Sequence, residues 1–269
     1  MKIETKVKQT LKKIKLSKKE KILVALSGGK DSTLTAYLLK KFGYDISGLH
    51  INLGMGKYSE DCLNAVEKLC SDLKIKLYVY DIKKEMGSSM CYLRTAIQTK
   101  RSLKNCAICG VIKKWIMNKE ARRLKFNKIA TGHNLDDEAQ TFLLNILKGS
   151  PKLSSNTGAI TRNVGNKKFI TRIKPLFYVP ENEIRKYTQE KKLPVVYQGC
   201  PCAIDSYRIQ VRKFLNDLSN KDKENIMKNF DRVSDKLQKL KDVRMNYCEI
   251  CEEPSRNNIC KKCELMKLK

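Results

Sequence analysis

The sequence predicts an α/β protein in which a doubly wound parallel sheet is followed by a helical C-terminal extension and a small cysteine-rich ribbon. Between residues 21 and 147, short apolar runs alternate with stretches of helical periodicity, as expected when helices cover a parallel sheet. A glycine turn joins the first apolar run to the first of these helices. Residues 246–269 contain four cysteines in close pairs and too few apolar residues for a core of their own.

The elements are expected in a regular order along the chain. Residues 1–20 predict a basic amphipathic helix, because Ile3, Val7, Leu11 and Ile14 recur at helical spacing between lysines. Pro180 predicts the start of a helix that continues to about residue 191, since proline is favoured in a first turn. Strands are expected at residues 22–26, 46–53, 75–80 and 128–131, helices at 32–42, 59–73, 111–124, 136–147 and within 207–243, a loop at 150–168 and an extended segment at 171–178.

The balance of charges indicates a polyanionic partner. Lysine and arginine number 56 and aspartate and glutamate 28, which gives a formal net charge of +28. A lysine-rich genome or a solvated surface would also raise the lysine count, but neither explains the shortage of acidic residues. Nucleic acid fits this charge better than an anionic membrane does.

The distribution of apolar residues argues against a membrane protein and against a secreted protein. No window has the apolar length of a membrane helix, and the first 20 residues carry eight lysines without the apolar core of a secretory signal. The eleven cysteines therefore predict a cytoplasmic protein, because in a reducing compartment paired thiols more often bind metal than form disulfides.

The segment from Ser27 to Ser32, with Gly28 and Gly29 before Lys30 and Asp31, predicts an anion-binding loop. A Gly-Gly pair alone is more often an ordinary tight turn. Here it lies between a predicted strand and a predicted helix, where backbone N–H groups can hold phosphate oxygens and Lys30 and Ser32 add donors. The spacing is too short for the loop that transfers a γ-phosphoryl group. It resembles the pyrophosphate-binding loop of the PP-loop ATP pyrophosphatases.

Two groups of cysteines predict metal sites of different kinds. The terminal pairs have the spacing of a structural zinc site in which protein fills every position, with a redox dithiol as the alternative. Cys106 and Cys109 have no second pair nearby, and Cys200 or Cys202 could complete a three-thiolate site for a [4Fe-4S] cluster. A zinc ion, a redox pair or plain burial are the alternatives for this second group. Cys62, Cys70 and Cys91 are interpreted as packing residues.

A third candidate follows the fourth predicted strand, where Asp136, Asp137 and Glu138 lie in the first turn of a helix. Such acids are typical of helix capping, and they are also candidate ligands of Mg²⁺ at a nucleotide site. The two histidines, His50 and His133, lack metal-ligand spacing, and His50 is equally well explained as a packed residue.

The loop at 27–32, the pair Cys106 and Cys109, the segment 132–134, the segment 199–201 and the terminal ribbon occur in one order along the chain. In that order they resemble the tRNA 2-thiouridine synthetases of the TtuA type, over essentially residues 5–266. The loop alone is generic, whereas the five features together are specific. The resemblance implies nucleotide contacts at Ala25, Leu26, Ser27, Asp31, Ile51 and Gly132, cluster ligands at Cys106, Cys109 and Cys200, catalytic roles for Lys113 and Asp137, and zinc ligands at Cys248, Cys251, Cys260 and Cys263.

The resemblance also implies a reaction and its partners. ATP, with Mg²⁺, adenylates the oxygen on C2 of a tRNA uridine, and sulfide carried on the [4Fe-4S] cluster then attacks C2 and displaces AMP. The sulfur donor would be a thiocarboxylated ubiquitin-like protein or free sulfide, and the enzyme a homodimer. The implied parts are a basic helix at residues 1–20, a catalytic domain at 21–206, a helical extension at 207–245 and a zinc ribbon at 246–269.

The sequence departs from this family in two places. Family members generally begin with a second zinc module, whereas this sequence begins with the basic helix, so the share of that module in tRNA binding is in question. Cys202 adds a thiol beside the third implied cluster ligand and could exchange with it.

Other functions explain fewer of the motifs. A lysidine synthetase or an amidotransferase would need no cluster cysteines, and a 2-thiocytidine synthetase would not account for the terminal ribbon. A zinc-ribbon RNA-binding protein with a degenerate nucleotide fold would not need Lys30, Asp31 and Ser32 intact.

Overall fold

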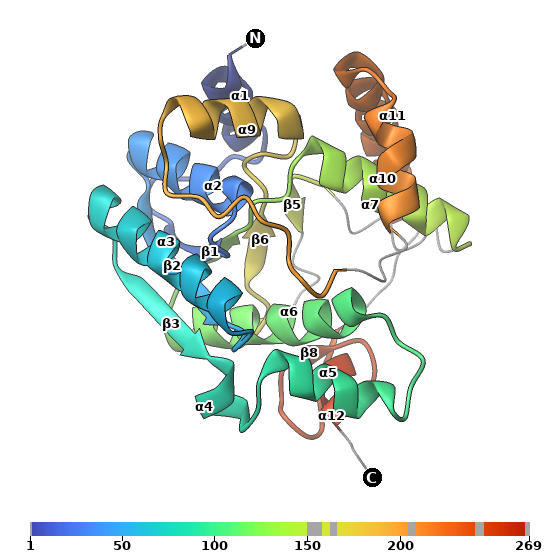
Figure 1. The fold of residues 1–269 in the computed structure, drawn as a ribbon. Helices are drawn as coiled ribbons and strands as arrows, with labels where there is room; N and C mark the ends of the chain where they lie inside the picture. The colour runs from blue at the N-terminus through green and yellow to red at the C-terminus, as the bar shows by residue number, and fades with distance from the viewer. Residues whose placement is uncertain (1, 150–157, 162–165, 204–207, 240–244, 267–269) are drawn as a thin grey trace.

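A computed structural model of the chain describes residues 2–149, 158–161, 166–203, 208–239 and 245–266, with a sheet of six strands at its centre (Figure 1). The strand order is β3-β2-β1-β4-β6-β5, and every pair is parallel except β5 with β6 at the edge. The predicted doubly wound parallel sheet is therefore confirmed. The strands span Lys21–Leu26 (β1), Asp45–Asn52 (β2), Leu77–Asp81 (β3), Lys128–Ala130 (β4), Ile160–Thr161 (β5) and Thr171–Ile173 (β6).

Helices cover both faces of the sheet because alternate strand residues point to opposite faces. On β1, Ile22 and Val24 belong to one core, whereas Leu23 belongs to another. The first core is covered by α1 (Ile3–Lys13), α2 (Lys30–Lys41), α3 (Lys57–Leu73) and α9 (Glu181–Glu190), and the second by α4 (Ile82–Met86), α5 (Met90–Gln98), α6 (Asn105–Arg123) and α12 (Lys261–Met266).

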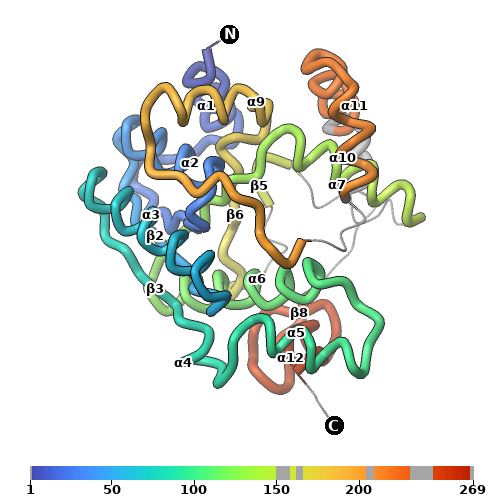
Figure 2. Tube along the Cα trace, viewed as in Figure 1, coloured from blue at the N-terminus to red at the C-terminus, as the bar shows by residue number. Residues whose placement is uncertain are grey.

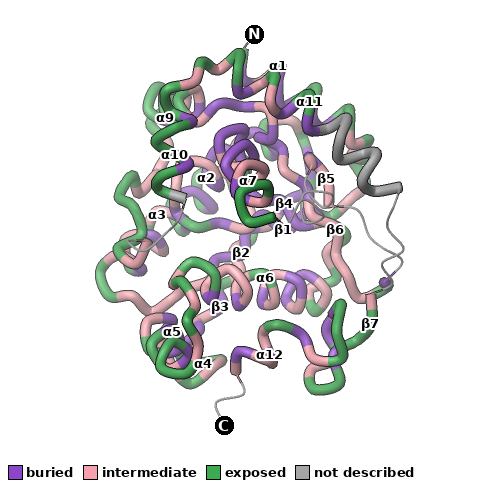
Figure 3. The backbone as a smooth tube through the Cα atoms, turned by 90° about the vertical axis from the view of Figure 1, so that its right-hand side faces the viewer, coloured by how far each residue is buried: buried purple, intermediate pink, exposed green. Residues whose placement is uncertain are grey.

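A third cluster joins α7 (Leu135–Leu147) to α10 (Arg208–Asn216) and α11 (Asn220–Lys239). Phe142 of α7 and Phe230 of α11 stack with their ring centroids 4.4 Å apart. Buried residues gather around the central strands and α7, whereas the outer helical turns are exposed (Figure 3). Among the described residues, no helix is long and apolar enough to cross a membrane.

The structure differs from the predicted elements in four places. The segment predicted as extended at 171–178 is a strand only over Thr171–Ile173 and then turns. Two short helices, α4 and α5, were not predicted. The side chain of Asp81 caps α4 by accepting hydrogen bonds from its backbone N–H groups, and the side chain of Ser89 caps α5 by accepting one. Helix α6 begins at Asn105, before the predicted residue 111, and continues through Gly110. Strand β5 lies in a segment predicted as loop, most of which falls outside the described residues.

The cysteine-rich ribbon consists of β7 (Asn246–Tyr247), β8 (Pro254–Ser255) and α12, and it packs on α6. The buried carboxylate of Glu253 accepts hydrogen bonds from Asn118 (2.9 Å) and from Arg122 (3.0 Å), both on α6. Arg101 Nη1, ahead of α6, lies 2.9 Å from a carboxylate oxygen of Glu264 in α12. Polar as well as apolar contacts therefore attach the ribbon to this helix.

Candidate active site

The glycine loop between β1 and α2 is closed by its own serines. Ser32 Oγ donates to the carbonyl oxygen of Gly29 (3.0 Å) and accepts a hydrogen bond from the backbone N–H of Ser27 (3.1 Å). Gly28 has a φ of 82°, and a Cβ at this position would lie 2.9 Å from Cys62 Cα on α3. A side chain is therefore disfavoured at Gly28 both by its backbone conformation and by its neighbour.

The segment after β4 lies directly against this loop. A Cβ on Gly132 would meet the carbonyl carbon of Asp31 and the nitrogen of Ser32, each at 2.7 Å. Asn134 Nδ2 donates to Asp31 Oδ1 at 2.9 Å. The two predicted nucleotide-facing loops thus meet at the carboxyl edge of the sheet, where ligands of such folds bind.

The remaining predicted nucleotide contacts lie on the two strands beside the loop. Leu26 ends β1, and Ile51 lies near the end of β2. His50 is buried, and its Nδ1 lies 2.9 Å from the carbonyl oxygen of Leu26. Burial lowers the pKa of His50, in agreement with its interpretation as a packed residue.

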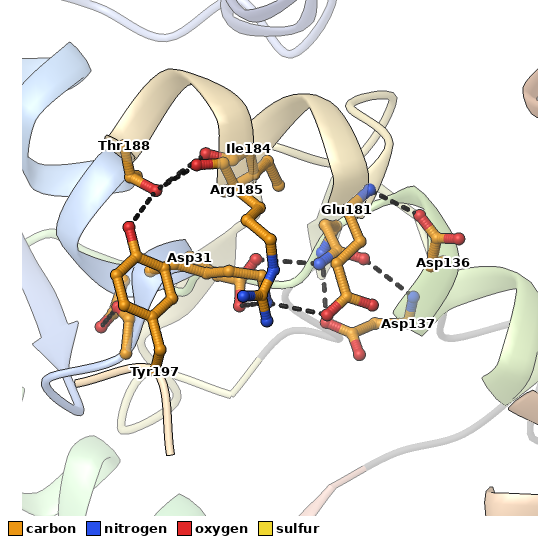
Figure 4. Close-up of polar contacts among 12 residues, drawn as sticks. Asp31, Asp136, Asp137, Glu181, Ile184, Arg185, Thr188 and Tyr197 are labelled. Atoms are coloured by element: carbon orange, nitrogen blue, oxygen red, sulfur yellow. Dashed lines mark hydrogen bonds and ion pairs between the residues drawn. The ribbon is translucent and has the colours of Figure 1, made fainter. Parts of the chain in front are cut away.

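The loop lysine is held by two carboxylates, those of Asp31 and Glu181, both labelled in Figure 4. Lys30 Nζ lies 3.0 Å from Asp31 Oδ2 and 2.8 Å from Glu181 Oε1, at the start of α9. Burial acts to lower the pKa of Lys30, but Asp31 and Glu181 outweigh it and the pKa is raised. Arg212 of α10 in turn donates to Glu181 at 2.6 Å. The α9–α10 region is thereby connected to the nucleotide loop.

The acids at the start of α7 make the capping contacts that their position predicts. Asn134 and Asp137 form a reciprocal capping box at the first turn. Asp136 is buried, and its carboxylate accepts hydrogen bonds from Lys223 Nζ (2.8 Å) and from the backbone N–H of Glu181 (2.7 Å). Glu138 pairs with Lys174 at 2.7 Å. Of the three acids, Asp137 is half-buried, whereas Asp136 and Glu138 are buried.

The three cysteines expected to bind the cluster come from two segments, the start of α6 and the chain after α9. Cys106 and Cys109 are in the first turns of α6, and Lys113 follows one turn later. The chain after α9 runs past the glycine loop to the N-terminal end of α6 (Figure 2), where Asn105 Nδ2 donates to the carbonyl oxygen of Cys202 at 3.3 Å. Cys106 and Cys200 are exposed.

The segment that leads to Cys200 contacts the glycine loop. The backbone N–H of Val196 donates to the carbonyl oxygen of Gly28 at 2.9 Å. The segment that leads to Cys200 is therefore hydrogen-bonded to the nucleotide loop. Three thiols, of which Cys106 and Cys200 are exposed, are chemically suited as a donor set to a cluster that keeps one iron accessible. Among the described residues, the ligand atoms that lie within 4.8 Å of one another are those of the terminal cysteines, so the cluster site stays a prediction.

Cys202 has a different environment. Arg94 Nη2 lies 2.8 Å from Cys202 Sγ and 3.1 Å from Cys91 Sγ. Arg94 is itself buried. Cys91, interpreted from the sequence as a packing residue, instead shares a guanidinium with Cys202, whereas Cys62 and Cys70 are buried as expected.

The terminal cysteines form a group that fits a metal ion. The sulfurs of Cys248, Cys251, Cys260 and Cys263 all lie within 4.8 Å of one another. Burial acts to raise the pKa of Cys248, but backbone N–H groups of Cys260, Cys251 and Ile250 outweigh it and lower the pKa to about 6. Burial and neighbouring thiols raise the pKa values of Cys260 and Cys263. A bound cation would relieve this crowding, and four thiolates are the ligand set of structural zinc.

Three polar contacts of this site were not predicted from the sequence. They are made by Glu181 in the first turn of α9, by Asn134 at the cap of α7 and by Arg94 within α5. Each reaches its partner across a long sequence separation, and no local pattern encodes such a contact.

The PP-loop domain family matches residues 1–230, and that match covers the nucleotide loop, the segment after β4 and the cysteines at 106, 109 and 200. The tRNA-5-methyluridine(54) 2-sulfurtransferase of Pyrococcus horikoshii is 40% identical over 272 residues, which are 99% of this chain and 85% of that protein. The chain belongs to the PP-loop tRNA sulfurtransferases.

Other members of this sulfurtransferase family cover the chain to a similar extent. Cytoplasmic tRNA 2-thiolation protein 1 of Drosophila mojavensis is 36% identical over 98% of this chain and 78% of its own length. The solved structure of the U34-tRNA thiolase NcsA from Methanococcus maripaludis, with its [4Fe-4S] cluster, has a TM-score of 0.79 and 27% identity. It covers 98% of this chain, which in turn covers 85% of it.

Proposed function

We propose that this sulfurtransferase thiolates C2 of a tRNA uridine in two steps, adenylation by ATP and displacement of AMP by sulfide. One observation carries the proposal: the segment leading to Cys200 is hydrogen-bonded to the glycine loop, through Val196 and Gly28. This contact supports one site for both steps at the carboxyl edge of the sheet. The named activities of the relatives from Pyrococcus and Methanococcus support the same reaction.

In the first step the loop receives the phosphates of ATP. The backbone N–H groups after β1 and the ammonium of Lys30 offer donors to the pyrophosphate part, and Lys30 must then leave Glu181. The C2 oxygen of the uridine attacks the α-phosphorus, and the bond to pyrophosphate breaks. This step is needed because a urea-like carbonyl oxygen is a poor leaving group, whereas AMP is a good one. The uridine has to leave its stack to reach the site.

In the second step sulfide attacks C2, the carbon–sulfur bond forms, and the bond to AMP breaks. Cys106, Cys109 and Cys200 would hold the [4Fe-4S] cluster, which supplies an iron at which sulfide is kept close to the base. Lys113, one helical turn after Cys109, would place a fixed positive charge where negative charge moves in both steps. Asp137, beside the loop, would position Mg²⁺ or the base.

We infer three further features of the working enzyme. Zinc would be held by Cys248, Cys251, Cys260 and Cys263, whose sulfurs already lie close together. The sulfur donor would be a thiocarboxylated ubiquitin-like protein or free sulfide. A homodimer is supported by large apolar side chains exposed on α7 and α10, namely Ile146, Leu147, Ile209 and Phe214.

Anaerobic thiolation of tRNA, with ATP and excess sulfide, tests the proposal. Wild-type protein should form 2-thiouridine, AMP and pyrophosphate, and Lys113→Ala should lose thiolation more than a hundredfold while keeping its cluster. Asp137→Asn separates a catalytic role from capping, because asparagine also caps a helix. Near wild-type turnover of Asp137→Asn would make Asp137 a cap, and a loss beyond a hundredfold would make it catalytic. An iron-free protein that thiolates fully would refute the cluster assignment.

The position of the modified uridine is tested by mass spectrometry of the product tRNA. The names of the relatives give two candidates, uridine 54 for the Pyrococcus enzyme and uridine 34 for the Methanococcus thiolase. Nucleosides mapped by position in tRNA from a deletion strain identify which of the two loses its sulfur.

A further inference from the structure

A groove lined by lysines lies at the end of α2 farthest from the glycine loop. It has a volume of about 740 Å³ and lies between α1, the turn that follows α1, and the connection from α2 to β2. Because α2 has 12 residues, the groove is separated from Lys30 by roughly 18 Å of helix. We call this feature the lysine groove; its lining residues are Lys8, Leu11, Lys12, Lys15, Leu16, Lys18, Lys41, Phe42 and Tyr44.

The positive charge of the lysine groove is only partly compensated by the protein. None of the described residues that line it is acidic, and Lys41 pairs with Glu4, outside the groove, at 2.8 Å. Lys8 Nζ lies 5.1 Å from the ring centroid of Phe42, and Lys18 Nζ lies 3.6 Å from that of Tyr44. Burial lowers the pKa of Lys18, and the charge of Lys8 lowers it further. Lysines that repel one another in a concave surface favour a bound anion.

We propose that the lysine groove binds the phosphate backbone of the substrate tRNA, away from the nucleotide that enters the active site. The inference rests on the proposed function, since tRNA is its ligand. It also explains part of the net charge of +28, because these lysines lie outside the catalytic site. A tRNA is far longer than the separation between the groove and Lys30, so one molecule can reach both.

The lining of the groove favours RNA over an acidic protein. Protein interfaces have an apolar centre with aromatic anchors, and charged residues are depleted there. None of the large apolar side chains exposed on the described residues lines the groove, and Tyr44 within it is only 9% exposed. Lysine ammoniums lie over the rings of buried Tyr44 and half-buried Phe42 and present positive charge at the groove. Contacts to phosphates have this character.

The backbone conformation of Lys15 allows a substitution whose effect on tRNA binding can be distinguished from its effect on protein stability. Lys15 has a φ of 53°, in the left-handed region that favours glycine. Lys74, at the end of α3, has nearly the same conformation (φ 50°), is exposed and lies outside the groove. Lysine-to-glycine substitutions at the two positions therefore have the same effect on charge and relieve the same backbone strain.

The test compares tRNA binding by two full-length double variants across a salt series. The groove variant, Lys12→Gln with Lys15→Gly, and the control variant, Lys68→Gln with Lys74→Gly, each lose two positive charges. The groove variant should bind tRNA about tenfold more weakly at low salt, and its plot of log K against log salt should be less steep by about 2. The control should match wild type. Thermal unfolding should show that neither variant is less stable.

Three outcomes would overturn the proposal. If both variants lose tRNA affinity equally, the effect is one of net charge alone. If the groove variant binds tRNA as tightly as wild type, the lysine groove does not bind RNA. Loss of binding to a poly-glutamate peptide in the groove variant alone, with tRNA binding intact, would assign the groove to an acidic protein. Failure of wild-type protein to thiolate any tRNA would instead refute the proposed function, which the salt series does not test.

Discussion

The ammonium of Lys30 and the carboxylate of Glu181 lie 2.8 Å apart, which joins the nucleotide loop to the start of α9. Both side chains are largely shielded from solvent, at 13% and 24% exposure. The lysine that should contact the phosphates of ATP is therefore already paired with a carboxylate. ATP has to compete with Glu181, and the cost of breaking this pair is part of the affinity that a binding experiment measures.

Glu181→Gln should strengthen ATP binding about threefold to tenfold, because the charge that competes for Lys30 is gone. Titration calorimetry with a non-hydrolysable ATP analogue measures this effect. Glu190→Gln, in the last turn of the same helix and 4.0 Å from Lys186, is the control and should leave the affinity unchanged. Weaker ATP binding by Glu181→Gln would show that the carboxylate orients Lys30 for ATP instead of competing with it.

The same substitution should change how stability depends on pH. Lys30 and Arg212 outweigh the burial of Glu181 and lower the pKa of its carboxyl group. A group with a lowered pKa adds stability above its ordinary pKa and loses that contribution as the pH falls. On acidification below about pH 4.5, the unfolding temperature of wild type should therefore fall more than that of Glu181→Gln.

Gly132→Ala should reduce the free energy of unfolding by about 1–3 kcal/mol, because a Cβ would meet the backbone of Asp31 and Ser32 at 2.7 Å. The first turn of α2 would have to move, so ATP affinity should fall about tenfold or more. Gly110→Ala is the matched control: a Cβ there meets nothing within 4 Å, and in a helix it should add about 0.5–1 kcal/mol. Urea unfolding followed by circular dichroism measures both. Unchanged stability and ATP affinity of Gly132→Ala would mean that the glycine loop and the segment after β4 can move apart at little cost.

Cys106→Ala, Cys109→Ala and Cys200→Ala should each abolish both the brown colour of anaerobically reconstituted protein and its thiolation activity. Cys202→Ala should keep the cluster, because Arg94 contacts the sulfur of Cys202 at 2.8 Å. Visible absorption and electron paramagnetic resonance show which of the four variants contain a cluster. A cluster in Cys200→Ala and none in Cys202→Ala would identify Cys202, not Cys200, as the third ligand.

Zinc should be present at about one ion per chain, even without the three cluster ligands, and Cys260→Ser should destabilise the ribbon. The raised pKa values of Cys260 and Cys263 mean that zinc binding releases protons from these thiols. Zinc should therefore be lost as the pH falls, and a chromogenic chelator measures its release. Cys70→Ser, at a buried thiol outside the ribbon, should retain the ion. Freshly prepared protein without zinc would contradict the assignment.

The sequence predicted those features that depend on residues close to one another along the chain. The glycine loop, the alternation of β1, α2 and β2, and the spacing of the ribbon cysteines are short-range features, and the structure has each of them. Gly132 was found by resemblance, and the physical reason for a glycine there is its contact with Asp31, about 100 residues away in sequence. Helices α4 and α5 are too short for a clear periodicity, and only Asp81 and Ser89 mark where they begin.

Long-range contacts leave no local pattern in the sequence. Glu181 reaches Lys30 only because α9 packs on α2, and Arg94 reaches Cys202 only because the chain after α9 returns to α6. Both acquire their partners from the packing of whole elements, so neither residue had a sequence signature of its own.

The attachment of the ribbon to α6 has a consequence for the assembly of the enzyme. This helix presents Cys106 and Cys109 at one end, and Asn118 and Arg122 bind the ribbon through Glu253 farther along. Glu253 in turn accepts a hydrogen bond from the backbone N–H of Cys248 through its carbonyl oxygen (2.9 Å). In a chain whose ribbon has not closed, the carboxylate of Glu253 would not be held against Asn118 and Arg122 of α6. Maturation should therefore be ordered, with zinc acquired before iron, and a zinc-starved cell should accumulate protein that takes up iron and sulfide poorly.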